Sequence, residues 1–533
     1  MTRKASLFAD SNHALAFWAG SLAVAIGVLL HIPMFLMGRY TQWKLAGMPM
    51  GAPMLFGMGL IIAGTAATAY GLIPHRTKTD VFEEIAPPED APLTRAHWVQ
   101  IALLSVALII DVMKPATLGF VVPGMRAEYG LTFAGVALLP FSGLLGTTVG
   151  SFIWGTLADI YGRRATILLA AIIFMGTSIC GAMPSFAWNI FMCFMMGLGA
   201  GGMLPVAYAL LAEIMPTRHR GWCLVLVGGI GTIGGYFVTS SLSAWLQPYF
   251  GWRIMWLLGL PISAILVVVS PLLPESARFL QSMGRLQEAR ETLARFGITV
   301  DNSAPKPAST RTVPAVSQAK LRSLLGLTCA LTLTALCVGF VSFGVLLWLP
   351  GSLMHEGRSM GAASKLIARS TLIAAPTIVL ASWLYSIWST KRTLILSVVV
   401  TTLGLVAILL RDVAGAPFLS NPVLPVVLLI MGTSGIVSMI LPYSAESYPL
   451  RVRGRATGWV AGFSKAGGLV AQGLGALALV PALGVAAGVV AIPCALAILL
   501  LAFLGHETHG RDLRELEDAR LTNDIAEVSV GLD

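Results

Sequence analysis

The stretch AEIMPTRHRG, residues 212–221, recurs as AESYPLRVRG at residues 445–454, 233 positions later. Ala, Glu, Pro, both Arg and Gly stand at the same spacing in the two copies. Each copy follows one long apolar run and precedes another, so each marks a short charged turn at one face of a membrane-spanning bundle. The repeat therefore predicts a membrane protein built of two similar halves.

Composition supports this class. Hydrophobic residues make up 56% of the 533 residues, charged residues only 11%, and the mean hydropathy is +0.81. A soluble domain carries roughly a quarter charged residues. The net charge of +10 lies in short loops between apolar runs, so nucleic-acid binding is not expected. The six cysteines form no CxxC pair or metal-ligand spacing, so neither a metal nor a cofactor is expected.

Apolar runs of bilayer length recur along the chain. The first two are retained helices, because the first run is longer than the apolar region of a signal peptide. Fourteen transmembrane helices are predicted, a two-helix extension followed by six plus six. The predicted spans are 14–38, 52–73, 98–122, 134–157, 165–183, 187–212, 221–246, 253–273, 324–354, 364–388, 393–411, 422–444, 457–480 and 484–505.

These spans divide the chain into five parts. Residues 1–97 form the extension and a polar linker, and 98–273 form the first six-helix bundle. Residues 274–322 form a cytoplasmic linker, in which 275–297 has the periodicity of an amphipathic helix. Residues 323–506 form the second bundle, and 507–533 form a cytoplasmic tail.

Lys and Arg predict the orientation. With a cytoplasmic N-terminus, 25 of the 35 fall in inner segments and 7 in outer segments, while Lys114, Arg369 and Lys465 lie inside apolar runs. Because positive residues concentrate in cytoplasmic loops, both termini are expected inside, in a multi-pass protein of the cell inner membrane.

A second motif, GTLADIYGRR at residues 155–164, follows the second span of the first bundle. Gly155 would permit close helix approach, Asp159 can meet a basic partner, and Arg163 and Arg164 place two cations in a tight turn at the inner surface. This motif resembles the signature loop of the major facilitator superfamily of secondary transporters. Its counterpart after the eighth main-body helix, WSTKR at 388–392, keeps two cations but lacks the glycine and the acid.

The repeated stretch resembles a turn of the sugar-porter and aromatic-acid:proton symporter branches of that superfamily. PESARFL at 274–280 and ETHGRDLREL at 507–516 resemble the segments that end each half in those branches. The resemblance covers about residues 98–516 and implies the six-plus-six major facilitator fold. The two-helix extension is not part of that pattern.

Alternating access requires contacts that form in one state and break in another. Asp159, Glu213 and Arg220 in one half, with Glu446 and Arg453 in the other, are therefore expected to form a gating network that stabilises the outward-facing state. The preference for positive residues in cytoplasmic loops also explains the arginines, but it does not explain the acidic residues Glu213 and Glu446.

Charges inside spans indicate function, because they are costly in hydrocarbon. Asp111 and Lys114 stand three residues apart and share a helix face, so a structural pair is one interpretation. The other follows from the resemblance, which implies that an acid in this helix couples protons. The resembled branches have an arginine where Cys193 stands, so Lys114 or Arg369 would have to act on Asp111 instead.

Lys114, Arg369 and Lys465 give three intramembrane cations against one acid, which favours an anionic solute. Snorkelling to the surface is the alternative for Arg369. The expected function is secondary transport, with proton-coupled import of a small carboxylate. A proton-coupled drug or metabolite antiporter, a sugar porter and a transporter-like receptor remain as alternatives. No ATP-binding loop or hydrolase motif occurs, so no enzyme is expected. The expected partners are the solute, protons and lipid, and the oligomeric state stays open.

Overall fold

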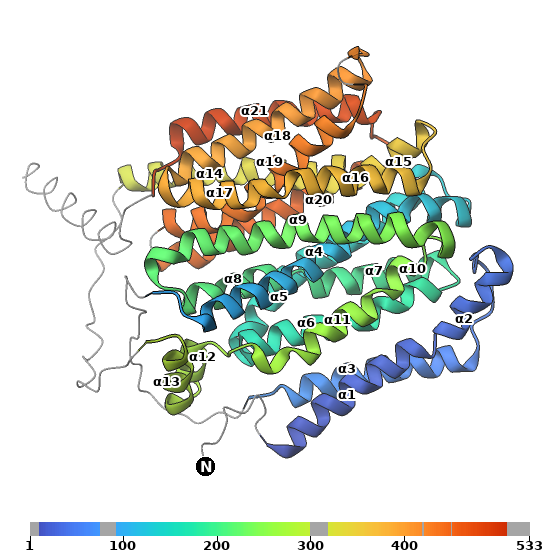
Figure 1. The fold of residues 1–533 in the computed structure, drawn as a ribbon, viewed down its shortest axis with the longest axis horizontal. Helices are drawn as coiled ribbons and strands as arrows, with labels where there is room; N and C mark the ends of the chain where they lie inside the picture. The colour runs from blue at the N-terminus through green and yellow to red at the C-terminus, as the bar shows by residue number, and fades with distance from the viewer. Residues whose placement is uncertain (1–9, 75–91, 299–317, 418–419, 449, 509–533) are drawn as a thin grey trace, which may run out of the picture.

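The computed structural model describes residues 10–74, 92–298, 318–417, 420–448 and 450–508 of the chain. All regular secondary structure in these residues is helical, and the long helices run side by side along one direction (Figure 1). Within the described residues, thirteen helical segments are long and apolar enough to cross a membrane. The expected all-α membrane fold is confirmed.

The first bundle contains the helices that follow the extension. Their bounds are α4 (Arg95–Tyr129), α5 (Phe133–Tyr161), α6 (Arg163–Gly176) continued by the 3₁₀ turn η2 (Thr177–Ala182), α7 (Phe186–Ala200), α8 (Met203–Ile214), α9 (Thr217–Phe250), α10 (Ile254–Leu257) and α11 (Gly259–Val268), followed by η3 (Ser270–Leu272). Several spans are thus broken, and the break between α7 and α8 falls at Gly201 and Gly202.

The second bundle repeats this order. Its elements are α14 (Gln318–Phe340), a π-helical turn η4 (Val341–Val345), α15 (Leu346–His355), α16 (Met360–Ala374), α17 (Pro376–Ile387), α18 (Thr390–Asp412), α19 (Val423–Ser447), α20 (Leu450–Ala476) and α21 (Leu483–Leu504). α20 is not among the thirteen segments, although it packs against α5 and α14. The count of fourteen transmembrane helices therefore stays a prediction.

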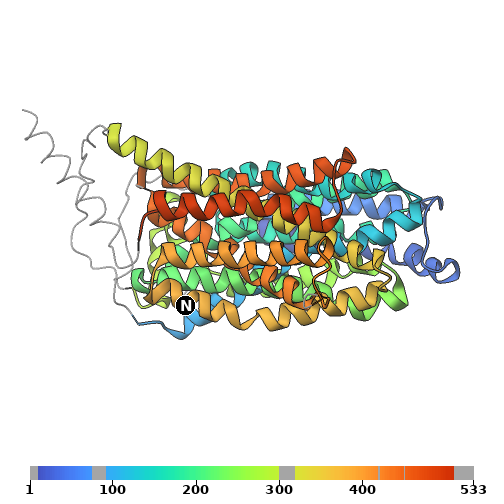
Figure 2. The same cartoon turned by 90° about the horizontal axis from the view of Figure 1, so that it is seen from above.

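Helices α4, α5 and α9 of the first bundle pack against the second bundle. α9 packs against α16, α17 and α19, α5 packs against α20, and α4 packs against α15. Figures 1 and 2 show the two sets of helices side by side along their full length. The centre of the molecule therefore lies where helices of both halves meet.

The leading helices form a hairpin on the outside of the first bundle. α1 (Ser11–Leu29) continues as α2 (Ile32–Met37) after a break before Pro33, and a short 3₁₀ turn η1 (Gly38–Thr41) leads towards α3 (Ala52–Gly71). Both α1 and α3 pack on α6, far from α14–α21 (Figure 1). We call α1–α3 with residues 38–51 the hairpin.

Glycines let α1 and α3 approach closely. A Cβ atom at Gly64 would lie 2.6 Å from the Gly20 carbonyl oxygen, and one at Gly57 would lie 2.7 Å from the Gly27 carbonyl oxygen. Small residues at an interface allow the backbones of two membrane helices to approach closely. The hairpin is therefore held by direct contact between the two helix backbones.

The linker differs from the single helix expected over 275–297. It forms α12 (Ala277–Ser282) and α13 (Leu286–Arg295), separated by Gly284, whose φ of 75° lies in the left-handed region. Residues 299–317 of the linker and the tail from residue 509 lie outside the described residues.

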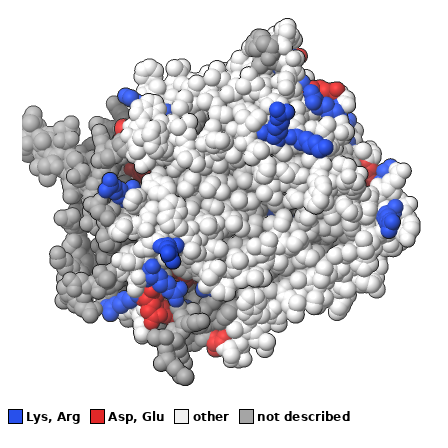
Figure 3. Space-filling model, viewed as in Figure 1, with Lys and Arg blue, Asp and Glu red and all other residues white. Residues whose placement is uncertain are grey.

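Charged side chains gather towards the two ends of the face shown in Figure 3, with a broad uncharged band between them. This distribution suits a bilayer around the middle of the molecule. We call the end with α12 and α13 the motif end, and the opposite end, with α10 and α15, the vestibule end (Figure 1).

Candidate functional site

A central cavity lies between the two halves. Its empty volume, which includes space open to solvent, is about 1050 Å³, and it is lined from α4, α5, α7, α8, α9, α14, η4, α19 and α20. Its charged lining residues are Asp111 from α4 and Lys465 from α20. The cavity therefore joins one carboxylate of the first half to one ammonium group of the second.

The charges of Asp111 and Lys465 act on each other across the cavity. Among the described residues, however, the two side chains form no direct ion pair. One carboxylate oxygen of Asp111, Oδ1, is buried and has no hydrogen-bond partner among the described residues. A buried polar atom without a partner is costly, so it is available to a proton or a ligand. The Asp111 carboxylate therefore offers the cavity a hydrogen-bond acceptor.

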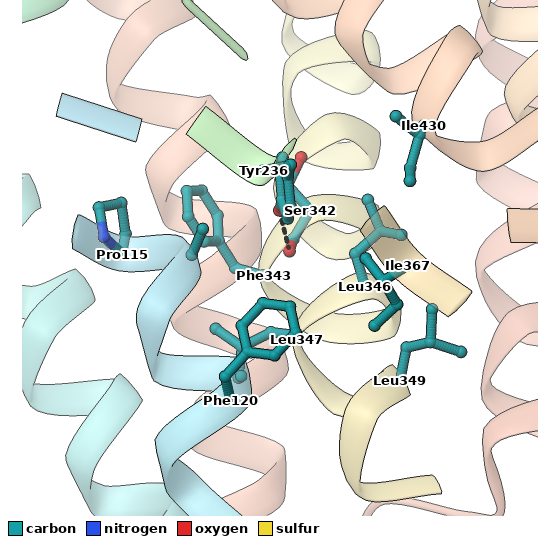
Figure 4. Close-up of a pocket in the computed structure, with 12 residues that line it drawn as sticks. Pro115, Phe120, Tyr236, Ser342, Phe343, Leu346, Leu347, Leu349, Ile367 and Ile430 are labelled. Carbon is teal, nitrogen blue, oxygen red and sulfur yellow. Dashed lines mark hydrogen bonds between the residues drawn. The ribbon is translucent and has the colours of Figure 1, made fainter. Parts of the chain in front are cut away.

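Aromatic rings form one wall of this cavity. The Lys465 Nζ atom lies 5.2 Å from the centre of the Phe343 ring, and Tyr236 lines the same space. The Tyr236 hydroxyl donates to the Ser342 carbonyl oxygen at 3.4 Å, a contact between the halves that Figure 4 marks with a dashed line. An aromatic solute would find a ring surface next to a cation here.

The other two predicted cations do not line the central cavity. Lys114 is buried inside the first bundle, where its Nζ donates to the Phe174 carbonyl oxygen at 3.1 Å. It forms no ion pair with Asp111 among the described residues, so the structural pair expected from their spacing is absent. Arg369 is exposed on α16 and does not line the cavity, so its role as a substrate-binding cation stays untested.

Three hollows follow one another along α4 and α14–α15. The central cavity involves residues 111–116 and 338–343, a small pocket involves 115–120 and 342–349 (Figure 4), and a wider vestibule involves 122–131 and 348–355. At the small pocket the helices are close, since a Cβ atom at Gly119 would lie 2.9 Å from the Leu347 carbonyl oxygen. This crossing narrows the route from vestibule to cavity.

Gly231, Gly234 and Gly235 pack α9 against α4. A Cβ atom at Gly231 would lie 2.5 Å from Leu108 Cβ, and one at Gly235 would lie 2.7 Å from Val112 Cβ. The run at residues 228–236 thus has the packing role that glycines commonly have in membrane helices.

A polar cluster closes the motif end of the first half. The Glu275 carboxylate accepts from the backbone N–H of Arg163 at 2.7 Å and of Arg164 at 3.3 Å, which caps the start of α6. Glu213 accepts from the Ser276 hydroxyl, and an Arg163 guanidinium nitrogen lies 3.5 Å from Glu213 Oε1. We call these residues the first motif cluster.

The second half has a matching cluster. Glu507 accepts from the Thr390 backbone N–H at 3.0 Å and so caps α18, and Glu446 accepts from the Thr508 hydroxyl at 2.8 Å. Glu446 also accepts from the Tyr385 hydroxyl at 2.8 Å. The repeat in sequence therefore corresponds to a repeat in hydrogen bonding, and these residues form the second motif cluster.

The predicted gating residues are distributed over these clusters. Asp159 is mostly exposed and lies 3.6 Å from Arg163, whereas Glu446 interacts across the halves with Arg220. The described residues place no side chain near a Cβ atom at Gly155, so the expected close helix approach is not seen there. The Arg453 side chain lies outside the described residues.

A family model described as Major Facilitator Superfamily matches residues 104–430. This chain belongs to the major facilitator superfamily. Its members and its curated relatives are transporters rather than enzymes, so the protein is a multi-pass membrane transporter. The matched segment begins within α4, so the hairpin lies outside it.

Curated relatives within the superfamily have about a quarter of their residues in common with this chain. The niacin transporter NiaP of Acinetobacter baylyi is 26% identical over 72% of this chain and 87% of its own length. The gallate transporter of Pseudomonas putida is 27% identical over 78% and 96%. The 4-hydroxybenzoate transporter PcaK of Acinetobacter baylyi is 25% identical over 76% and 90%.

Among solved structures, the proton:xylose symporter XylE bound to 6-bromo-6-deoxy-D-glucose has a similar fold. The TM-score is 0.63 at 18% identity, over 79% of this chain and 98% of that one. At this identity the likeness concerns the fold, and it confirms the major facilitator fold implied by the sequence motifs.

Several residues of these sites received no role from sequence reasoning. Glu275 lies in PESARFL and Glu507 in ETHGRDLREL, the motifs that end the two halves. The matching positions of these two acids, each just after the last helix of its half, could have indicated a shared role. Phe343 and Tyr236 gave no signal, because a single aromatic residue in an apolar span is usually packing. Their role depends on which helix faces meet.

Proposed function

We propose that this transporter imports small aromatic carboxylates together with protons, with its motif end in the cytoplasm. The observation that carries the proposal is the position of Lys465 beside the Phe343 ring and opposite Asp111 in the central cavity. Niacin, gallate and 4-hydroxybenzoate, the solutes in the relatives' names, are all aromatic acids.

Charge balance suggests how protons would be coupled. The empty cavity holds one carboxylate and one ammonium group, Asp111 and Lys465. A solute carboxylate on Lys465 would add a second negative charge in a buried space, where unbalanced charge is costly. A proton on Asp111 would restore the balance, so solute and proton would bind together.

The cavity favours a carboxylate over a sugar. The described residues that line it include no Asn or Gln, the side chains that pair well with sugar hydroxyl groups. The orientation predicted from Lys and Arg places the wide vestibule on the outer face, where an imported solute would enter.

Transport by reconstituted vesicles tests the proposal. We expect the wild-type protein to accumulate labelled 4-hydroxybenzoate when the outside is acidic, and Asp111→Asn to exchange solute across the membrane without accumulating it. Arg369→Gln is the matched control, since it removes a charge outside the cavity and should leave accumulation intact. Accumulation by Asp111→Asn at the wild-type level would exclude Asp111 as the coupling residue.

A further inference from the structure

The vestibule carries a pair of basic side chains that nothing described so far uses. Among the described residues that line it, Arg126 from α4 and His355 from the end of α15 are the titratable ones. The empty volume of this hollow, which includes space open to solvent, is about 1740 Å³. Arg126 belongs to the first half and His355 to the second, so the pair spans the opening between the halves.

Arg126 and His355 approach each other across this opening. An Arg126 guanidinium nitrogen lies 3.5 Å from the His355 Nε2 atom. A guanidinium group only donates hydrogen bonds, so this contact is a hydrogen bond only when Nε2 carries no proton. If His355 took up a second proton, two cations would face each other at this distance.

An anion between the two groups would remove that repulsion. Both side chains would then be donors, and a carboxylate can accept from two donors at once through its two oxygens. Protonation of His355 and binding of an anion should therefore favour each other. Imidazole is suited to this because its charge changes between about pH 5 and pH 8.

Neighbouring acids are already engaged. Glu356 accepts from Arg411 at 2.5 Å, and Asp412 lies 3.1 Å from Arg411. On the side of α4, Glu128 pairs with Arg253 at 2.6 Å. Arg358, a further cation near His355 in sequence, is exposed and does not line the vestibule. These contacts leave Arg126 as the charged group that faces His355.

The vestibule also offers aromatic surface. Phe133 and Trp348 both line it, with ring centres 6.5 Å apart in an edge-to-face arrangement. A ring stacked there would bring its carboxylate within the same hollow as Arg126 and His355. The three hollows along α4 would then lead the solute through the narrow crossing at Gly119 and Leu347 to the central cavity.

We propose that Arg126 and His355 form a second, pH-dependent site, which captures an aromatic carboxylate in the vestibule before it reaches the central cavity. The solute class rests on the proposed function, whereas the site rests on the vestibule geometry. The site would raise the local concentration of solute when the outer solution is acidic, the condition in which the proton gradient favours import.

Binding of benzoate to the purified full-length protein, measured by calorimetry, tests the site. The variant Lys465→Met removes the cation of the central cavity and should leave one weaker binding event. That event should strengthen roughly tenfold between about pH 8 and about pH 6. Adding His355→Gln to Lys465→Met should abolish the pH dependence, and adding Arg126→Gln should weaken binding roughly tenfold.

Adding Arg358→Gln to Lys465→Met is the matched control and should change neither affinity nor pH dependence. Equal affinities for Lys465→Met with and without His355→Gln at both pH values would overturn the proposal, as would no benzoate binding by Lys465→Met. If Lys465→Met binds benzoate as described but the wild-type protein transports no aromatic carboxylate, the proposed function fails while the vestibule site stands.

Discussion

Glu128 and Arg253 form a buried ion pair that anchors the hairpin to the first bundle. An Arg253 guanidinium nitrogen lies 2.6 Å from Glu128 Oε1, with side-chain exposures of 0% for Arg253 and 4% for Glu128. The same carboxylate oxygen accepts from the backbone N–H groups of Leu45 and Ala46 at 2.7 and 3.0 Å. The hairpin loop and the ends of α4 and α10 therefore meet at one carboxylate.

Replacing Glu128 by Ala should destabilise the protein by about 3–5 kcal/mol, because Arg253 would be left buried and unpaired. Thermal unfolding of the purified protein measures this. Glu356→Ala is the control, since it removes an ion pair near the surface and should cost about 0–1 kcal/mol. Similar losses in the two variants would contradict a special role for the Glu128 pair.

The contact between α1 and α3 should tolerate no side chain at Gly64. Gly64→Val would place its Cβ 2.6 Å from the Gly20 carbonyl oxygen, so we expect a loss of about 1–3 kcal/mol from overpacking. Gly59→Val, on the same helix, is the control, because a Cβ there meets nothing within 4 Å. Thermal unfolding and protease cleavage of the hairpin distinguish the two. Equal behaviour would show that the helices are not packed through Gly64.

Substitutions of Lys465 and Lys114 should have different effects, on transport and on stability respectively, although both residues are intramembrane cations. Lys465→Met should raise the KM for an aromatic carboxylate roughly tenfold or more by removing a charge-assisted contact, with little loss of stability. Lys114→Met should lower stability or expression and leave KM nearly unchanged, since Lys114 contacts α6 rather than the cavity. A large KM effect of Lys114→Met with normal stability would contradict this assignment.

The first motif cluster should make stability depend on pH. Burial raises the pKa of Glu275, although backbone N–H groups and Arg164 oppose the shift. Because the pKa is higher in the folded protein, this group contributes stability at low pH and loses it as pH rises from the ordinary glutamate range of about 4.3 through the raised pKa. Glu275→Gln removes the titration.

We therefore expect the melting temperature to fall less between about pH 4 and about pH 8 in Glu275→Gln than in the wild-type protein. Arg278→Gln, which changes a charge on the neighbouring helix α12, is a control for surface charge. A larger fall in Glu275→Gln than in the wild-type protein would reverse the sign and reject the assignment.

Sequence patterns predicted the architecture well where they were periodic or repeated. The bilayer-length runs located the helices, although breaks before Pro33 and between α7 and α8 divided some of them, and Gly284 divided the predicted linker helix in two. Charge spacing predicted less. Asp111 and Lys114 are near one helix face by spacing, yet positions three apart do not point in the same direction on a helix of 3.6 residues per turn. Asp111 lines the central cavity, whereas Lys114 contacts the Phe174 carbonyl inside the first bundle.

The sequence by itself determined a membrane protein with two related halves, because hydrophobic length and a ten-residue repeat are local properties of the chain. Only the tertiary structure decided that Lys465 rather than Lys114 faces Asp111, that Glu275 and Glu507 cap matching helices, and that Glu128 holds the hairpin loop. These contacts join residues from helices far apart in the chain. Their geometry depends on which helix faces pack together, which helical periodicity alone does not specify.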